Sequence, residues 1–224
     1  MTGSPRVVAI DGAAGSGKST LARGLARELR IPYVNTGLMY RALAAEALRR
    51  QIAPDDAPAL VEVMGSLRFR FTGEDPVVCE VEGLPIEELT SSEVERTVSA
   101  VSRHPEIRRA MRDAQRSIGL ESGAVMEGRD IASAVFPDAP VKLYLVAEPG
   151  ARAARRAEER ATGDAAVAED LHARDEADAR TNPHEPADGA DVVDTGTLSI
   201  AETLAEALRL VGLRAPWMLP EGSR

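Results

Sequence analysis

The sequence predicts an α/β fold in which a five-stranded parallel sheet is covered by helices. Short apolar stretches with the character of buried strands alternate along the chain with helical stretches, and this order is typical of a parallel, doubly wound sheet. The first of these strands leads through a glycine-rich turn into an amphipathic helix. The middle of the chain breaks the order, because two strictly alternating stretches there indicate an antiparallel hairpin inserted into the fold.

The chain opens with the unit of strand, glycine-rich turn and helix. Residues 6–11 are a short apolar strand, and the helix predicted over residues 18–30 has leucines at every fourth position, which places them on one face. Pro32 ends this helix. Residues 33–35 are predicted as a second parallel strand, and Thr36 as the N-cap of the helix that follows.

The middle of the chain is predicted to form the hairpin and then two helices. Residues 67–71 alternate apolar and polar side chains, turn residues follow over 72–76, and the alternation then resumes. Ser92 and Glu95 indicate a capping box at the start of the first helix. The second helix begins at Pro105 and is basic.

The remaining parallel strands are predicted in the second half of the chain. Residues 124–127, 141–146 and 190–194 are the candidates, and the second of them is apolar enough for burial on both faces. A helix over residues 198–210 follows the last strand. Residues 148–182 are charged and helix-prone, with little apolar content.

The composition narrows the classes of function. The chain has 224 residues, of which 44% are apolar, and this suits one domain, or one core with an insertion. A net charge of −9 disfavours a nucleic-acid partner, and no apolar run approaches the length of a membrane span. The single cysteine, Cys79, excludes an intrachain disulfide and a cysteine-built zinc site. With no secretory segment at the N-terminus, we expect a cytoplasmic monomer.

The strongest functional signal is a glycine-rich loop, Gly12 to Ser19, which fits the pattern G-x-x-x-x-G-K-[ST] in full. Its glycines let successive backbone N–H groups point at one phosphate, and the N-terminus of the next helix adds positive potential. Lys18 would reach the β- and γ-phosphates of a nucleotide, and the Ser19 hydroxyl would bind Mg²⁺. The nucleotide-binding residues predicted here are Gly12, Ala13, Ala14, Gly15, Ser16, Gly17, Lys18, Ser19 and Thr20.

The loop predicts nucleotide binding and leaves the reaction open. GTPases also need an Asn-Lys-x-Asp motif, and neither Asn35 nor Asn182 precedes a lysine. A kinase for a small molecule or nucleotide fits the length best. Such a kinase needs arginines that converge on two anions. Arg129 and the adjacent Asp130 lie where the carboxyl end of a strand is expected, and Arg41 lies one turn into the helix after Thr36.

These residues carry a resemblance to the bacterial cytidylate (CMP) kinases, which belong to the nucleoside monophosphate kinase superfamily. The Tyr-Arg, Gly-Arg-Asp and Arg-Asp-x-x-Asp motifs are more specific to that family than the loop alone. The stretches that resemble the family follow one another in the same order through nearly the whole chain, at residues 10–20, 35–41, 99–108, 127–130, 135–142, 174–178 and 193–195.

The resemblance implies a chain of three parts. They are a P-loop three-layer core with the five-stranded parallel sheet, an enlarged monophosphate-binding insertion with antiparallel strands, and a helical lid. The implied boundaries are residues 1–34, 119–148 and 183–224 for the core, 35–118 for the monophosphate-binding region, and 149–182 for the lid.

The resemblance also implies a role for each matching residue: some would hold the CMP phosphate, some would read the base, and some would bind the sugar. The implied substrate-binding residues are Thr36, Tyr40, Arg41, Ser99, Arg108, Arg129, Asp130, Arg174 and Asp178. The implied catalytic residues are Lys18, Arg129 and the lid arginines Arg155 and Arg156, which share a charged segment with Arg152 and Arg160.

The chemistry of cytosine agrees with the residues that would read the base. A carboxylate at Asp130 suits the N4 amino donor, while Ser99 and Arg108 suit the acceptors N3 and O2. Uracil has an acceptor in place of N4, and it would leave Asp130 facing another acceptor.

The resemblance therefore implies transfer of the ATP γ-phosphoryl group to CMP or dCMP, with Mg²⁺. Two alternatives stay open. One is a P-loop kinase for UMP, dTMP or a non-nucleotide acceptor, and the other is an NTP-binding module that acts without an acceptor.

Overall fold

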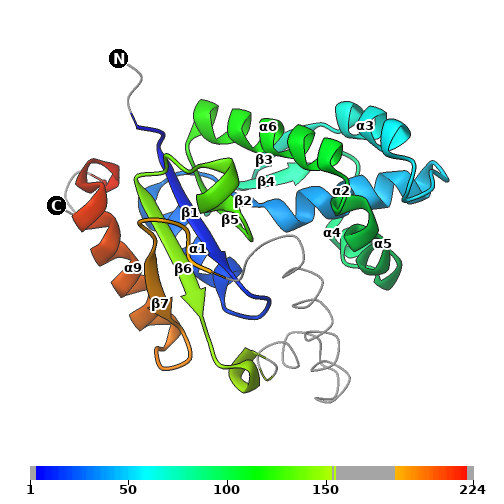
Figure 1. Ribbon diagram of the computed structural model, residues 1–224. Helices are drawn as coiled ribbons and strands as arrows, with labels where there is room; N and C mark the ends of the chain where they lie inside the picture. Colours follow the sequence, from blue (N-terminus) through cyan, green and yellow to red (C-terminus); the bar gives the residue numbers. More distant parts are fainter. Residues whose placement is uncertain (1–3, 153, 155–184, 221–224) are drawn as a thin grey trace.

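The computed structural model describes residues 4–152, 154 and 185–220. Within these residues, seven strands form one sheet in the order β3-β4-β2-β5-β1-β6-β7 (Figure 1). The strands are β1 (Val7–Gly12), β2 (Tyr33–Asn35), β3 (Phe69–Thr72), β4 (Val78–Val81), β5 (Ala124–Gly128), β6 (Val141–Val146) and β7 (Asp191–Asp194). None of the helices in this described part is long and apolar enough to cross a bilayer.

The predicted five-stranded parallel sheet is confirmed as the run β2-β5-β1-β6-β7. In the middle of this run, β1 is buried along its whole length and pairs on one side with β5 and on the other with β6. Ile10, for example, lies between Glu127 and Leu143. The carboxyl ends of β1, β5 and β6 therefore meet at one edge of the sheet.

The predicted hairpin is also confirmed, since β3 and β4 are antiparallel and place Phe71 opposite Cys79. The sequence did not predict where the hairpin attaches. Strand β4 runs parallel to β2 and pairs with it through Tyr33 and Val78, and the Tyr33 N–H donates to the Val77 carbonyl at 2.8 Å. The hairpin thus extends the parallel sheet by two strands.

Helices cover both faces of the sheet. The α-helices are α1 (Lys18–Leu29), α2 (Thr36–Arg49), α3 (Ala57–Ser66), α4 (Ile86–Leu89), α5 (Ser92–Ser102), α6 (Pro105–Ser122) and α9 (Ile200–Arg214). A π-helical turn η1 (Ile131–Val135) follows β5, and a 3₁₀ turn η2 (Pro216–Met218) follows α9. Helices α1, α2, α5, α6 and α9 were predicted from the sequence, whereas α3 and α4 were not.

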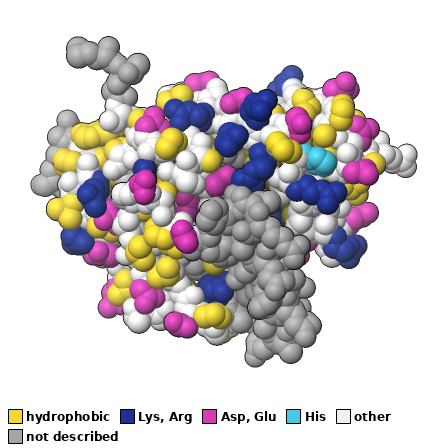
Figure 2. All heavy atoms as spheres, in the orientation of Figure 1, with side chains coloured by type: hydrophobic (Ala, Val, Ile, Leu, Met, Phe, Trp, Pro, Cys, Tyr) yellow, Lys and Arg dark blue, Asp and Glu magenta, His cyan; other side chains and the backbone are white. Residues whose placement is uncertain are grey.

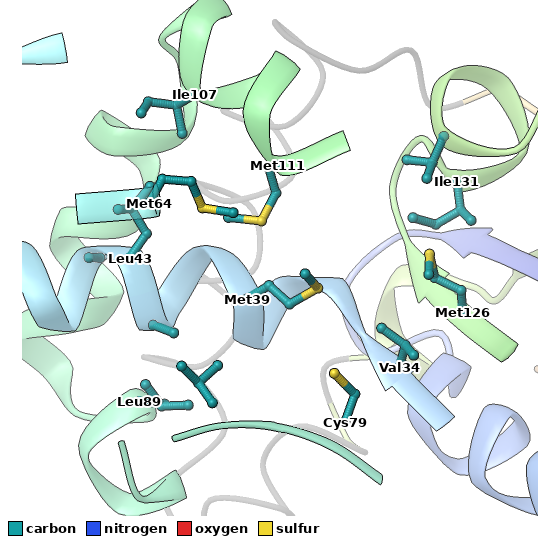
Figure 3. Close-up of a cluster of buried hydrophobic side chains, with 14 of the residues drawn as sticks. Val34, Met39, Leu43, Met64, Cys79, Leu89, Ile107, Met111, Met126 and Ile131 are labelled. Carbon is teal, nitrogen blue, oxygen red and sulfur yellow. The ribbon is translucent and has the colours of Figure 1, made fainter. Parts of the chain in front are cut away.

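Alternate residues of β1 enter two different hydrophobic clusters. Val8 and Ile10 pack with α1 and α9 on one face, while Val7 and Ala9 join the cluster built from α2, α3, α5 and α6. Figure 3 shows part of this second cluster, which includes Ile131. Two helical layers around one sheet make the three-layer core that the sequence predicts.

The structure corrects two predicted caps. Asn35, and not Thr36, is the N-cap of α2, because its side chain accepts a hydrogen bond from the Leu38 N–H at 3.1 Å. Thr36 is the first helical residue, and its hydroxyl donates to the Glu127 carbonyl. For α5 the cap is Ser91.

No capping box forms at Ser92. The Ser91 hydroxyl accepts from the Val94 N–H, and the Glu95 carboxylate pairs with Arg41. In both helices the structure selects the preceding residue, which has the same kind of short polar side chain.

Candidate active site

The glycine-rich loop joins β1 to α1 at the edge of the sheet where the parallel strands end. Its first glycine lies so close to β6 that a Cβ at Gly12 would be 2.4 Å from the Leu145 carbonyl oxygen. Gly15 has a φ of +71°, and a Cβ there would be 2.8 Å from the Arg152 carbonyl oxygen. Only glycine fits at these two positions without moving the backbone around it.

Three cations donate to three successive carbonyl oxygens of the loop. Arg129 donates to Gly12 at 2.8 Å, Lys18 Nζ to Ala13 at 2.7 Å, and Arg152 to Ala14 at 3.1 Å. They come from the turn after β5, from α1 and from the segment after β6, so the fold concentrates positive charge around this loop. Lys18 was predicted at this loop, Arg129 was predicted as a catalytic residue that also holds the CMP phosphate, and Arg152 was one of the four predicted lid arginines.

The far side of the loop is bonded to Thr195, the residue that follows β7. The Thr195 hydroxyl donates to the Ser16 carbonyl at 2.9 Å, and the Thr195 N–H donates to Val146 at the end of β6. The Ser16 hydroxyl is buried and has no hydrogen-bond partner among the described residues. Ser19 and Thr20 are exposed residues at the start of α1.

The arginine and threonine predicted on α2 have defined partners. Arg41 forms an ion pair with Glu95 at 3.1 Å and donates to the Leu89 carbonyl. Thr36 is buried, and its hydroxyl bonds to the Glu127 carbonyl at 2.7 Å, which joins α2 to the end of β5. These bonds place the first turns of α2 beside the strand that leads to Arg129.

Arg108 and Asp130 are brought together as a half-buried ion pair. Their charged atoms are 2.6 Å apart, and each side chain is 20% exposed. Burial raises the pKa of the Tyr40 phenol to about 12, with the Arg108 charge lowering it and the Asp130 charge raising it. Three residues predicted from the resemblance, on α2, on α6 and after β5, therefore form one cluster.

Helix α6 carries several arginines, and the structure distinguishes between them. Figure 2 shows basic side chains gathered over this part of the surface. Arg116 pairs with Asp138 and lies over the Phe136 ring, which is a contact that braces the fold. Arg108 is the α6 arginine that reaches Asp130.

Ser99 is not brought into the cluster by any described contact. It is exposed on α5, and its described bond is made by its backbone carbonyl, which accepts from the Ser102 hydroxyl. Four other predicted site residues lie outside the described part of the chain. They are Arg155, Arg156, Arg174 and Asp178.

Sequence reasoning missed a buried carboxylate directly before the loop. Asp11 is the last residue but one of β1, is 4% exposed, and accepts hydrogen bonds from the N–H groups of Ile131 at 2.9 Å and Ala132 at 2.8 Å. Burial raises the pKa of this carboxyl to about 6, although the two backbone bonds lower it. The available signal was a charged residue at the end of an apolar strand.

A second buried network lies between β2 and β5. The Tyr33 hydroxyl donates to the Glu127 carboxylate at 2.6 Å, and the Asn35 amide donates to the Tyr33 oxygen at 3.2 Å. Burial, followed by the Glu127 charge, raises the pKa of the Tyr33 phenol, and the Arg23 guanidinium lies 4.6 Å above its ring. Glu127 lies in the stretch 127–130 that resembles the family, but no role was predicted for it.

The described residues contain no site in which protein side chains alone could hold a metal ion. They contain no group of three or more His, Cys, Asp or Glu side chains that could hold one. Mg²⁺ in phosphoryl-transfer sites takes one or two protein ligands and completes its shell with phosphates and water. The exposed Ser19 hydroxyl beside the cation-rich loop fits that pattern.

Comparison with protein families matches residues 8–212 to the cytidylate kinase family. Cytidylate kinase from Deinococcus radiodurans is 41% identical over 208 residues, which cover 92% of this chain and 99% of that protein. Cytidylate kinase from Mycobacterium leprae (strain Br4923) is 39% identical over 224 residues, covering 93% of this chain and 96% of that protein.

The chain also matches one part of a longer protein. It spans 40% of the bifunctional pantoate ligase/cytidylate kinase of Synechococcus sp. (strain JA-3-3Ab), with 39% identity over 216 residues and 91% of this chain covered. The family match extends from β1 to α9 and includes the glycine-rich loop, Arg41, Arg108, Arg129 and Asp130. The chain belongs to the cytidylate kinase family.

Proposed function

We propose that the protein transfers the γ-phosphoryl group of ATP to CMP or dCMP, giving ADP and CDP or dCDP. One observation carries the proposal: two adjacent residues after β5 face two different sites. Arg129 bonds to the glycine-rich loop, where the nucleotide phosphates would lie, and Asp130 bonds to Arg108, where the base would lie. A donor site and an acceptor site are thus joined by one peptide bond.

The proposed reaction needs positioning and charge more than proton transfer. A phosphate monoester has a second pKa of about 6, so its attacking oxygen is already ionised at neutral pH. Lys18 and Arg129 would leave their loop carbonyls to bind phosphate oxygens and neutralise charge as it moves to the leaving ADP. Mg²⁺, held by the Ser19 hydroxyl and the phosphates, would supply further neutralisation.

Base selection is proposed for Asp130 and Arg108. When CMP binds, the Asp130 carboxylate would accept from the cytosine N4 amino group, and Arg108 would donate to a ring acceptor. The half-buried site favours this exchange, because hydrogen bonds to charged groups are stronger away from water. Ser99 is proposed as a further base contact, which requires movement of its exposed side chain on α5.

The other predicted assignments remain proposals as well. Arg41, Thr36 and Tyr40 would contact the acceptor phosphate and its surroundings, Arg174 and Asp178 the sugar, and Arg155 and Arg156 the transferred group. The three proposed parts of the chain keep the boundaries given above, with a lid over residues 149–182. We propose a cytoplasmic monomer that binds these small molecules and neither nucleic acid nor membrane.

The test is a comparison of acceptors. ADP release is measured with ATP and Mg²⁺ in the presence of CMP, dCMP, UMP, AMP, dTMP or no acceptor. We expect turnover with CMP and dCMP well above that with the others. Faster turnover with UMP or dTMP would assign a different kinase, and equal ADP release without an acceptor would assign an NTP hydrolase.

A further inference from the structure

The buried Asp11 carboxylate spans two parts of the site through its two oxygens. Oδ1 accepts from the Ile131 N–H and Oδ2 from the Ala132 N–H, while the next residue along the chain, Gly12, begins the glycine-rich loop. Burying a carboxylate is costly unless hydrogen bonds compensate it, and two backbone donors do so here. An apolar residue at this position of a buried strand would cost less free energy of desolvation. The fold of the strand alone therefore does not explain the carboxylate.

The two N–H groups belong to the first residues of η1, which begins directly after Arg129 and Asp130. The same turn is held on its other side by the Ile131 side chain, which is fully buried in the hydrophobic cluster of Figure 3. A third bond runs from Arg129 to the Gly12 carbonyl. Three hydrogen bonds therefore connect Arg129, Ile131 and Ala132 of the turn to two consecutive residues of β1.

The turn has little room to shift. A Cβ at Gly128 would lie 2.5 Å from the Thr36 hydroxyl and 2.7 Å from the Ile131 Cδ1, so the chain passes between α2 and the turn in close contact with both. The position of Asp130, and through it of Arg108, is then set relative to the loop by the bonds to Asp11.

We infer that Asp11 is a positioning residue, which acts through Arg129 and Asp130 to fix the acceptor-binding turn against the glycine-rich loop. A carboxylate is required, because each of two neighbouring N–H groups needs its own acceptor oxygen. Asparagine has the same size but one acceptor, and its amide N–H₂ group would face the second N–H. The inference rests on the proposed function for the identity of the acceptor and not for the geometry.

The test compares Asp11→Asn with the unchanged protein. We expect kcat/KM for CMP to fall by about 10- to 100-fold, through both a higher KM for CMP and a lower kcat, because misplacement by about 1 Å has effects of this size. The KM for ATP should change by less than about threefold, since the loop keeps its glycines and Lys18. Leu210→Ala in α9, far along the chain in the other cluster, is the matched control for lost stability.

Hydrogen exchange gives a readout that needs no substrate. In Asp11→Asn, the amides of residues 129–135 should exchange faster, while those of α9 should not change. In Leu210→Ala the exchange should quicken in α9, with the kinetic constants for CMP unaltered.

Three results would overturn the inference. They are unchanged exchange at residues 129–135, equal losses for CMP and ATP, and failure of Asp11→Asn to fold, which would make the carboxylate a requirement of the fold alone. If the unchanged protein prefers another monophosphate, the proposed function fails, and the same ratio measured with that acceptor still decides the role of Asp11.

Discussion

The glycine-rich loop and the acceptor side hold their cations in different ways. At the loop, the cations donate to neutral backbone carbonyls, as Lys18 does to Ala13. On the acceptor side, Arg108 donates to a carboxylate, that of Asp130, and the pair is half-buried. Among the described contacts, the loop cations thus have neutral acceptors, whereas Arg108 has a charged one.

This difference suggests that the loop contributes affinity for phosphates and the acceptor side contributes selection of the base. Backbone N–H groups and cations recognise phosphate oxygens and no base, so the loop alone would discriminate little between nucleotides. Opening a half-buried ion pair is costly unless the ligand supplies matching charge and hydrogen bonds. In the proposed function, the acceptor side would therefore reject a base that leaves Asp130 or Arg108 without a hydrogen-bond partner.

The largest effect is expected from removal of the loop cation. Lys18→Ala should lower kcat by about 1,000-fold or more, because it removes a charge that is proposed to contact the transferred phosphoryl group. Steady-state ADP release measures the effect. The matched control is Lys142→Ala, which removes the other lysine, on β6, where it bonds to the Asp188 carbonyl. Similar losses in both variants would contradict the special role of the loop.

A methyl group at the end of β5 should damage the acceptor side selectively. Gly128→Ala would place a Cβ against the Thr36 hydroxyl and Ile131, and we expect kcat/KM for CMP to drop by about 100-fold, with the KM for ATP little changed. In Gly65→Ala the new Cβ meets nothing within 4 Å, so this variant in α3 should keep full activity.

Removal of the Asp130 carboxylate should reduce selection more than turnover. We expect Asp130→Ala to narrow the preference for CMP over UMP by about 10- to 100-fold, which corresponds to about 1–3 kcal/mol for one base contact. The ratio of kcat/KM values for the two acceptors is the measurement. Asp138→Ala breaks the exposed ion pair with Arg116, which lies on α6 as Arg108 does, and this variant should leave the ratio unchanged. Equal losses for CMP and UMP would exclude Asp130 from base reading.

The smallest effect concerns the pH dependence of stability. The folded protein binds the Asp11 proton more tightly than the unfolded chain does, because burial raises its pKa from 3.8 to about 6 against the opposing charge of Lys18. The resulting stabilisation is complete below pH 3.8 and is lost as the pH rises through about 6.

Lowering the pH from 7 to 5 should therefore raise the free energy of unfolding of the unchanged protein by about 1 kcal/mol more than that of Asp11→Asn. Urea unfolding at the two pH values measures this difference. An identical shift in both proteins would show that Asp11 keeps its ordinary pKa when folded.

Patterns within a few residues were enough to predict the strands, the loop and most helices. The leucines of α1 and the motif from Gly12 to Ser19 are local signals, and the structure places them as predicted. The cluster of Tyr40, Arg108 and Asp130 was reached through family resemblance, because nothing in the sequence alone brings α2, α6 and β5 together.

What the sequence could not predict depends on contacts between distant parts of the chain. The partners of Asp11 are backbone N–H groups 120 and 121 residues away. Every residue except proline has such a donor, so the sequence does not indicate which ones Asp11 binds. The pairing of β4 with β2 is likewise non-local. The cap of α2 was predicted one residue too late, because Asn35 and Thr36 can both cap a helix. The Thr36 hydroxyl bonds to the distant Glu127 carbonyl instead, and Asn35 is the cap.

The attachment of the hairpin has a consequence for how the molecule opens. Strands β1, β5 and β6 share continuous ladders, but β4 meets β2 through the single pair of Tyr33 and Val78. Segments with few backbone bonds to their neighbours open at a lower free energy than the global unfolding energy. In backbone pairing the sheet is thus joined most weakly between β4 and β2, and we expect the amides of the hairpin to exchange with solvent before those of the strands that carry the loop.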